Sequence, residues 1–362
     1  MTSWILDTLS KCSPFLKRFS KYVLVSASLT VVASFLISHF LGVFLMLFTP
    51  EGLEVMNILI EGIPVTIYTV SIVIPVEVSR GSFFLVLWVF QLICFLVAMR
   101  VREGIISTIR SVFEDSVKNI FRNNILSTPF IANAALIIVL AVYFLQESQG
   151  IPTGAPPEIN KYEFYFLLTY ASIFEEFTFR VLFIGVFEAV TIVRLYSYLV
   201  DAGERRFNRF SIFLRALAFP QKTKESLGLV GIWKRERMGL IPEEWLILIV
   251  SAVMFGLAHL LSGIGWEVGK VTHATFVGLV LGLIYIKFGF QASMILHWFF
   301  NNYFEAYSIA SDFIPQIEVF SDFLDWLNTF LGVIFLAAIV YVFIVKLTKV
   351  DEEEKQIDST PI

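Results

Sequence analysis

The sequence predicts an all-α polytopic membrane protein, built as a bundle of about eight transmembrane helices. Hydrophobic residues make up 57% of the 362 residues and charged residues only 16%, and the mean hydropathy is +0.77. A soluble domain usually carries about 25% charged residues. Apolar runs recur at the length of about 20 residues that a bilayer core requires. A multi-pass protein embedded in the lipid bilayer is therefore expected.

Eight runs satisfy this length rule. In chain order they are 22–48, 83–99, 129–145, 162–187, 244–261, 271–286, 290–309 and 324–345. Lys and Arg are enriched in cytoplasmic connections. Of the 27 Lys and Arg, 23 fall in the two terminal segments and in alternate connections, whereas the opposite side has only Arg80, Lys161 and Lys270. Both termini are therefore predicted to be cytoplasmic.

The runs divide the chain into four parts. Residues 1–160 form an N-terminal three-helix membrane region, and 161–310 form a core that includes a long basic cytoplasmic loop, 188–243. Residues 311–350 contain the last transmembrane helix, and 351–362 form an acidic tail expected to be disordered. Inside the loop, 207–219 mixes apolar residues and Arg at helical spacing, which predicts a helix lying on the membrane surface.

Charged residues interrupt the fourth run. Glu175, Glu176 and Arg180 lie inside 162–187, where a single charged group costs about 2.5–3.5 kcal/mol by insertion scales. Residues four apart share a helix face, so Glu176 and Arg180 are expected to pair. Glu175 is rotated by about 100° from Glu176 and stays available for another partner. The pattern predicts one structural carboxylate and one that exchanges protons.

Later runs carry further polar groups. Phe255 and His259 share a face of the fifth run, and His297 and Asn301 share a face of the seventh. Gly278 and Gly282 in the sixth run allow neighbouring helices to approach closely. The two other histidines, His39 and His273, are interpreted as bonded to carbonyls of neighbouring helices.

Together these groups predict hydrolysis of a buried bond. Glu175 can take a proton from water, and His259 can orient that water or protonate the leaving amine. His297 and Asn301 can donate hydrogen bonds to the developing oxyanion. The alternative explanation is a set of unrelated packing features, which requires several costly coincidences.

Other classes of protein remain open. A zinc-dependent variant would use His259, His297 and Glu175 as ligands, but the sequence contains no H-E-x-x-H motif, which favours a metal-free site that requires no cofactor. A non-enzymatic membrane immunity or scaffold protein would use the same groups for binding. A proton-coupled transporter is less favoured because no internal repeat is found.

Three motifs in order resemble one known family. Glu-Glu-x-x-x-Arg from Glu175, Phe-x-x-x-His from Phe255 and His-x-x-x-Asn from His297 are similar to the signature of the CPBP family, which comprises type II CAAX prenyl endopeptidases and bacteriocin-immunity and processing proteins. The resemblance covers about 162–308. It implies a helical bundle with a conical cavity open toward the cytosol and the membrane. Characterised members remove the last three residues of prenylated CAAX proteins.

The resemblance also implies roles for the residues. Glu175 and His259 would activate water, and His297 and Asn301 would stabilise the oxyanion. Glu176 and Arg180 would hold the site together. The predicted function is thus a glutamate-dependent intramembrane endopeptidase of the CAAX type. Its partners would be the bilayer and the C-terminal segment of a membrane-anchored protein, prenylated or not, rather than nucleic acid.

Overall fold

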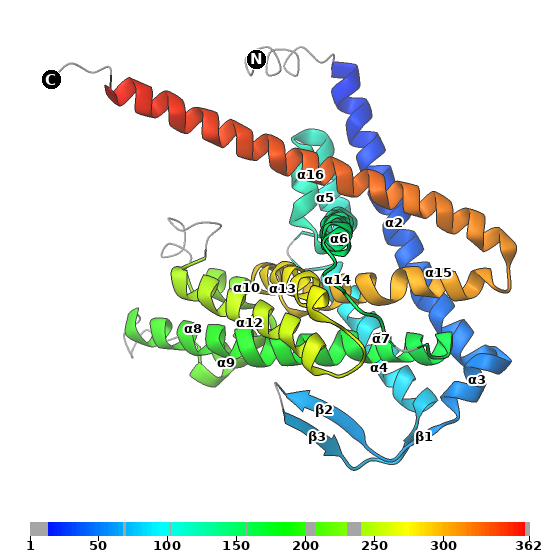
Figure 1. The fold of residues 1–362 in the computed structure, drawn as a ribbon. Helices are drawn as coiled ribbons and strands as arrows, with labels where there is room; N and C mark the ends of the chain where they lie inside the picture. The colour runs from blue at the N-terminus through cyan, green and yellow to red at the C-terminus, as the bar shows by residue number, and fades with distance from the viewer. Residues whose placement is uncertain are drawn as a thin grey trace.

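Eight helical runs dominate the computed structural model, which describes residues 14–67, 70–101, 103–156, 158–199, 207–229 and 240–358 (Figure 1). Each run overlaps one of the predicted spans. In chain order they are α2 (Pro14–Phe48), α4 (Arg80–Ala98), α6 (Asn124–Ser148), α7 (Lys161–Glu176) continued by η2 (Phe177–Gly185) and α8 (Val186–Leu199), α12 (Pro242–Leu261), α13 (Val268–Phe288), α14 (Phe290–Trp298) continued by η4 (Phe299–Tyr303) and α15 (Phe304–Ser311), and α16 (Pro315–Asp358).

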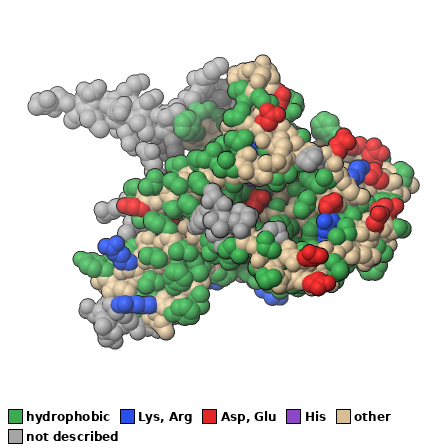
Figure 2. Space-filling model, turned by 60° about the horizontal axis from the view of Figure 1, so that its bottom comes forward, with side chains coloured by type: hydrophobic (Ala, Val, Ile, Leu, Met, Phe, Trp, Pro, Cys, Tyr) green, Lys and Arg blue, Asp and Glu red, His purple; other side chains and the backbone are tan. Residues whose placement is uncertain are grey.

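Six helices of the described chain are long and apolar enough to cross a membrane. The two remaining runs are divided by the π-helical segments η2 and η4, so neither contains one uninterrupted α-helix of that length. Hydrophobic side chains are spread across the face in Figure 2, and acidic side chains gather mainly toward its right end. The chain is therefore a mostly helical polytopic membrane protein. The count of eight crossings and the cytoplasmic termini stay predictions.

Two helices continue past their predicted ends. The fourth run extends beyond residue 187 to Leu199 because Ala189, Ile192 and Tyr196 are buried in a cluster with α9 (Arg209–Ala218). The backbone of α16 is helical through Asp358, where the acidic composition predicts disorder. The remainder of that tail, 359–362, and parts of the basic loop, 200–206 and 230–239, lie outside the described residues.

Helix α9 occupies the segment for which a surface helix is predicted. Ile212 and Ala216 are buried on one side, and Phe210 and Leu214 are exposed on the other. After α9 comes the short helix α10 (Pro220–Ser226), which contacts α8, α9 and α13. The loop is thus partly folded against the helical core.

The first extramembrane connection contains strands that the hydrophobic pattern did not reveal. Helix α3 (Pro50–Met56) precedes β1 (Leu59–Ile60), β2 (Ile63–Ile67), β3 (Val70–Ile74) and β4 (Val78–Ser79). Strands β2 and β3 pair antiparallel, with Ile63 opposite Ile74, and β1 pairs with β4. The signal was the density of Val, Ile and Thr, which favour strands. Helix α5 (Ile105–Glu114) and η1 (Val117–Arg122) form the next connection.

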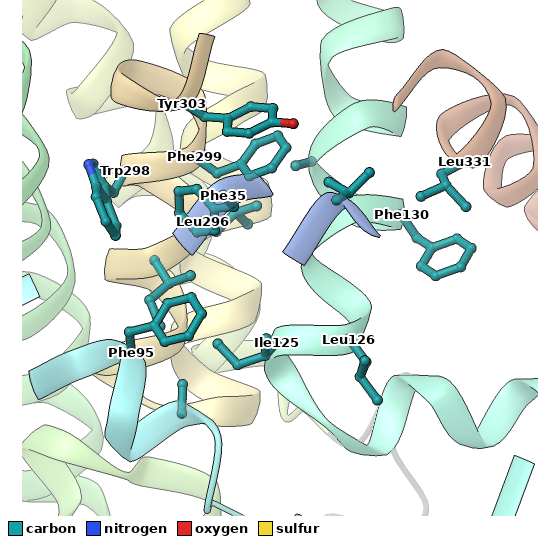
Figure 3. Close-up of a cluster of buried hydrophobic side chains, with 14 of the residues drawn as sticks. Phe35, Phe95, Ile125, Leu126, Phe130, Leu296, Trp298, Phe299, Tyr303 and Leu331 are labelled. Atoms are coloured by element: carbon teal, nitrogen blue, oxygen red, sulfur yellow. The ribbon is translucent and has the colours of Figure 1, made fainter. Parts of the chain in front are cut away.

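Aromatic rings fasten the N-terminal helices to α14 and η4 (Figure 3). The ring of Phe35 on α2 lies 4.8 Å from that of Trp298, 5.1 Å from Phe299 and 5.8 Å from Tyr303. Phe95 on α4 lies 6.0 Å from Phe35. Each such pair adds about 0.5–1.5 kcal/mol beyond simple burial. This cluster fixes the helix on which His297 lies.

Glycines set the spacing of α12 and α13, as the small-residue pattern predicts. A Cβ added at Gly278 would lie 3.1 Å from the Cα of Ala252. A Cβ at Gly256 would lie 2.6 Å from the carbonyl oxygen of Val271. At these two positions each helix therefore lies close against the backbone of the other, whereas a Cβ at Gly282 would meet the side chains of Leu248 and Ile184.

Replacing Gly256 with Ala is expected to lower the stability of the protein by about 1–3 kcal/mol, because α12 and α13 must separate to admit the methyl group. Thermal denaturation in detergent measures the effect. Val253→Ala on the same helix changes a side chain that is 40% exposed, so it serves as the control. Equal midpoints for the two variants would contradict the proposed close contact.

Candidate active site

The paired glutamates lie where α7 passes into η2. π-helical segments are rare and are frequently found at functional sites. The wider turn changes the backbone bonding, and the carbonyl of Phe179 in η2 accepts a hydrogen bond from Ser251 Oγ of α12 at 2.8 Å. This bond joins α12 to the helix that carries Glu175 and Glu176.

Glu176 is fully buried and is held by three partners. Its Oε1 lies 3.3 Å from Arg180 Nη2, which is the ion pair that the spacing predicts. The same oxygen lies 2.9 Å from His297 Nδ1, and Oε2 accepts a hydrogen bond from the Ser293 hydroxyl. A buried carboxylate must be paired. The partners of Glu176 lie on η2 (Arg180) and on α14 (His297 and Ser293), so its carboxylate joins these two elements.

Arg180 is also fully buried and contacts an aromatic ring. Its guanidinium carbon lies 4.6 Å from the ring centroid of Phe255, within the range of a cation–π interaction. The same ring lies 6.0 Å from the imidazole of His297 and 4.9 Å from that of His259. Phe255 therefore packs between Arg180 and both imidazoles.

Glu175 approaches His297 from the other side. Its side chain is 31% exposed, and Oε2 lies 3.6 Å from His297 Nε2. That distance is too long for a hydrogen bond but within ion-pair range. A carboxylate can only accept, so Nδ1 of His297 donates to Glu176 and Nε2 is the nitrogen directed to Glu175. The imidazole thus lies between two carboxylates, one buried and one accessible.

His259 approaches from α12. Its Nδ1 lies 2.9 Å from the carbonyl oxygen of Phe255. Since a carbonyl only accepts, Nδ1 carries the hydrogen, and Nε2 of the neutral ring has a lone pair free to accept a proton. The ring of His259 lies 4.9 Å from the ring of Phe255, which also lies 6.0 Å from that of His297. Side chains from the three predicted motifs therefore meet in one place.

Asn301 lies one turn away from this meeting point. Its amide nitrogen lies 3.4 Å from the Leu168 carbonyl and 3.4 Å from Ser172 Oγ, both on α7 before Glu175. Among the described residues, no contact joins Asn301 to Glu175 or His297. The shared face expected for His297 and Asn301 assumed a regular α-helix, whereas Asn301 lies in the wider turn of η4.

Sequence reasoning missed two polar partners of the site. Ser293 lies four residues before His297 on α14, so helical spacing could have placed it on the same face. Asn302 Nδ2 donates to Thr169 Oγ1 at 2.7 Å. The spacing of a regular α-helix gave no reason to predict a contact for Asn302 in addition to Asn301. The two contacts tie α14 and η4 to α7.

A metal-binding set is not found among the described residues, because no three of their His, Cys, Asp or Glu side chains converge around a point where one ion could bind. Two hollows in the described part lie along α6, and Asn124 and Thr128 line one of them. The zinc ligand set and the conical cavity stay predictions.

A second buried ionic cluster lies outside the motifs. Lys224 Nζ on α10 lies 2.7 Å from Glu188 Oε2 on α8 and bonds Glu244 on α12, and all three side chains are fully buried. Glu188 directly follows the predicted span 162–187. The cluster fastens the basic loop to α8 and α12.

The fold and this arrangement define a class: a polytopic helical membrane protein with ionisable groups from three helices gathered in its interior. Residues 160–303 match the family model described as Rce1-like, type II CAAX prenyl endopeptidase. That match confirms the predicted family resemblance over this region, which contains every motif residue. It supports a CAAX-type protease of the membrane. No curated protein and no solved structure gives a significant match.

Proposed function

We propose that the protein hydrolyses a peptide bond near the C-terminus of a membrane-associated protein, using water activated by Glu175 and His259. The observation that carries the proposal is the position of His297 between Glu176 at 2.9 Å and Glu175 at 3.6 Å. An accessible carboxylate base, an oriented imidazole and a second imidazole in one site suit acid–base catalysis of hydrolysis.

The chemistry begins with a water between Glu175 and His259 Nε2. Glu175 takes one proton, the oxygen attacks the scissile carbonyl carbon, and the carbonyl electrons move to its oxygen. We assign to His297 the role of donating a hydrogen bond from Nε2 to the oxyanion. The amide of Asn301, one turn away, is assigned the same hydrogen-bonding role.

The tetrahedral intermediate then collapses. The carbonyl re-forms, the carbon–nitrogen bond breaks, and the leaving amine takes the proton held by Glu175, directly or through His259. The products are a shortened protein with a new C-terminal carboxylate and a released peptide. The carboxylate of Glu175 is restored without any covalent intermediate.

The test uses purified protein in lipid nanodiscs with a farnesylated peptide ending in three aliphatic residues. Mass spectrometry is expected to show release of the C-terminal peptide, and in heavy-oxygen-labelled water the new carboxylate carries one labelled oxygen. Absence of product from this peptide and from the membrane proteins of the host, compared by C-terminal proteomics, would favour the immunity or scaffold alternative.

A metal-free mechanism is expected to retain full cleavage after treatment with a strong zinc chelator. In the proposal a carboxylate generates the nucleophile, so no Lewis acid is required. Metal analysis of the same preparation provides the second measurement. Loss of cleavage that added zinc restores would instead support the ligand set Glu175, His259 and His297.

A further inference from the structure

Lys270 lies beside the proposed site, in the first turn of α13. The contacts of the α12–α13 pair show its level: Gly278 lies against Ala252, and Gly256 against Val271. The helices run antiparallel, so the next turn along α12 lies beside the start of α13. That turn carries His259. Lys270 and His259 are therefore at the same level of the helix pair.

Their side chains also belong to faces that converge. Ala274 on α13 is buried in one cluster with Phe179 and Phe255. Lys270 precedes Ala274 by four residues, and His259 follows Phe255 by four residues, so each shares a face with its cluster member. Both side chains extend from this cluster toward the same end of the helix pair.

Backbone hydrogen bonds fix the start of the helix that carries Lys270. The amide of Gly269 donates to the carbonyl of Pro152 at 2.9 Å, and that of Glu267 donates to Thr153 at 2.9 Å. Trp266 forms a β-bridge with Gly154, and Lys270 Nζ lies 3.9 Å from its ring centroid. A cation–π contact leaves N–H groups available to donate.

The ammonium has no acidic partner of its own. Within the described part of the chain, no carboxylate lies within ion-pair distance of Lys270, whose Nζ lies 3.9 Å from the Trp266 ring centroid. Partly buried charges are normally paired. A lysine at the level of the proposed site without a carboxylate partner has the chemistry of an anion receptor.

We propose that Lys270 binds the C-terminal carboxylate of the substrate; this inference rests on the proposed function. A protease that cleaves near a C-terminus needs a group that distinguishes a free carboxylate from a continuing chain. Three extended residues span about 10 Å, which sets the separation expected between the scissile carbonyl and that carboxylate. The competing role for a lysine near a helix end is to reach a lipid phosphate.

The experiment compares two farnesylated peptides that differ only at the C-terminus, one a free acid and one an amide, in phosphatidylcholine nanodiscs. The wild-type protein is expected to cleave the acid with about 10- to 100-fold higher kcat/KM, mainly through KM, as for loss of one charge-assisted hydrogen bond. Lys270→Met is expected to remove this preference and Lys270→Arg to retain most of it. Lys161→Met alters an exposed lysine paired with Asp312 at 2.7 Å and is the control.

Each outcome supports or overturns the role assigned to Lys270. Equal cleavage of acid and amide by the wild type, or an acid preference that survives Lys270→Met, overturns the assignment and leaves the lysine to lipid. Should Lys270→Met fail to fold, Lys270→Gln takes its place. Should the wild type cleave neither peptide, the proposed function fails, and binding of the two peptides to Glu175→Gln protein tests Lys270 separately: equal affinities overturn the receptor role, and tighter binding of the acid supports it.

Discussion

Glu175→Gln is expected to lower kcat for peptide cleavage by about 10³-fold or more while leaving the thermal midpoint unchanged. Glutamine keeps the shape of the side chain but cannot take a proton from water, and loss of acid–base catalysis typically removes about 10²–10⁴-fold. Stability should be retained because this side chain is partly exposed and, within the ranges that the structure describes, its carboxylate makes only the 3.6 Å approach to His297.

The control is Glu163→Gln, which removes a carboxylate at the same helix, paired with Arg80 at 3.0 Å near the surface. Its cleavage rate is expected to match that of the wild type. The single variant His259→Gln should lose activity, as Glu175→Gln does. Activity retained by Glu175→Gln, with cleavage at the same bond, contradicts the assignment of the base even where the protein proves to be a protease.

Arg180→Met is expected to destabilise the protein by about 3–5 kcal/mol, because it leaves the carboxylate of Glu176 buried with its charge uncompensated. Both side chains are 0% exposed, so solvent cannot replace the lost partner. The measurement is unfolding of the detergent-solubilised protein by heat or denaturant. Arg209→Met, which changes an exposed arginine on α9, should have little effect.

A double variant separates charge pairing from packing. Adding Glu176→Gln to Arg180→Met removes the stranded charge, so the pair should be less destabilised than the sum of the single changes. Additive losses would show that Arg180 stabilises the bundle chiefly through its contact with Phe255. In either case the cleavage rate of the folded fraction reports whether His297 keeps its orientation.

The ion pair of Glu176 with Arg180 and most of the membrane spans could be predicted from local spacing along the chain. Glu176 and Arg180 are one turn apart in any helix, and hydrophobic length alone marks most of the spans. The same reasoning left Glu175 without an intrahelical partner, and the structure places it next to His297. Local rules therefore identified the groups, although the roles assigned to them remain proposals.

Regular helical geometry was the assumption that limited the rest. η2 and η4 are π-helical, and this periodicity is not visible in the apolar pattern, so Asn301 was expected beside His297 rather than at Leu168 and Ser172. The strands between α3 and α4 were missed because a length rule for spans ignores the Val and Ile content of connections. The extension of the fourth run to Leu199 depends on packing against α9.

The amino-acid sequence by itself determined the membrane class, the approximate helices and the set of ionisable residues, because hydrophobic length and the cost of burying charge act locally along the chain. Only the tertiary structure decided which of those residues meet. The pairing of Lys224 with Glu188 and Glu244 and the approach of Ser293 to Glu176 each join groups from different helices. Helix packing fixes such contacts, and helix packing depends on side-chain shapes summed over the whole bundle.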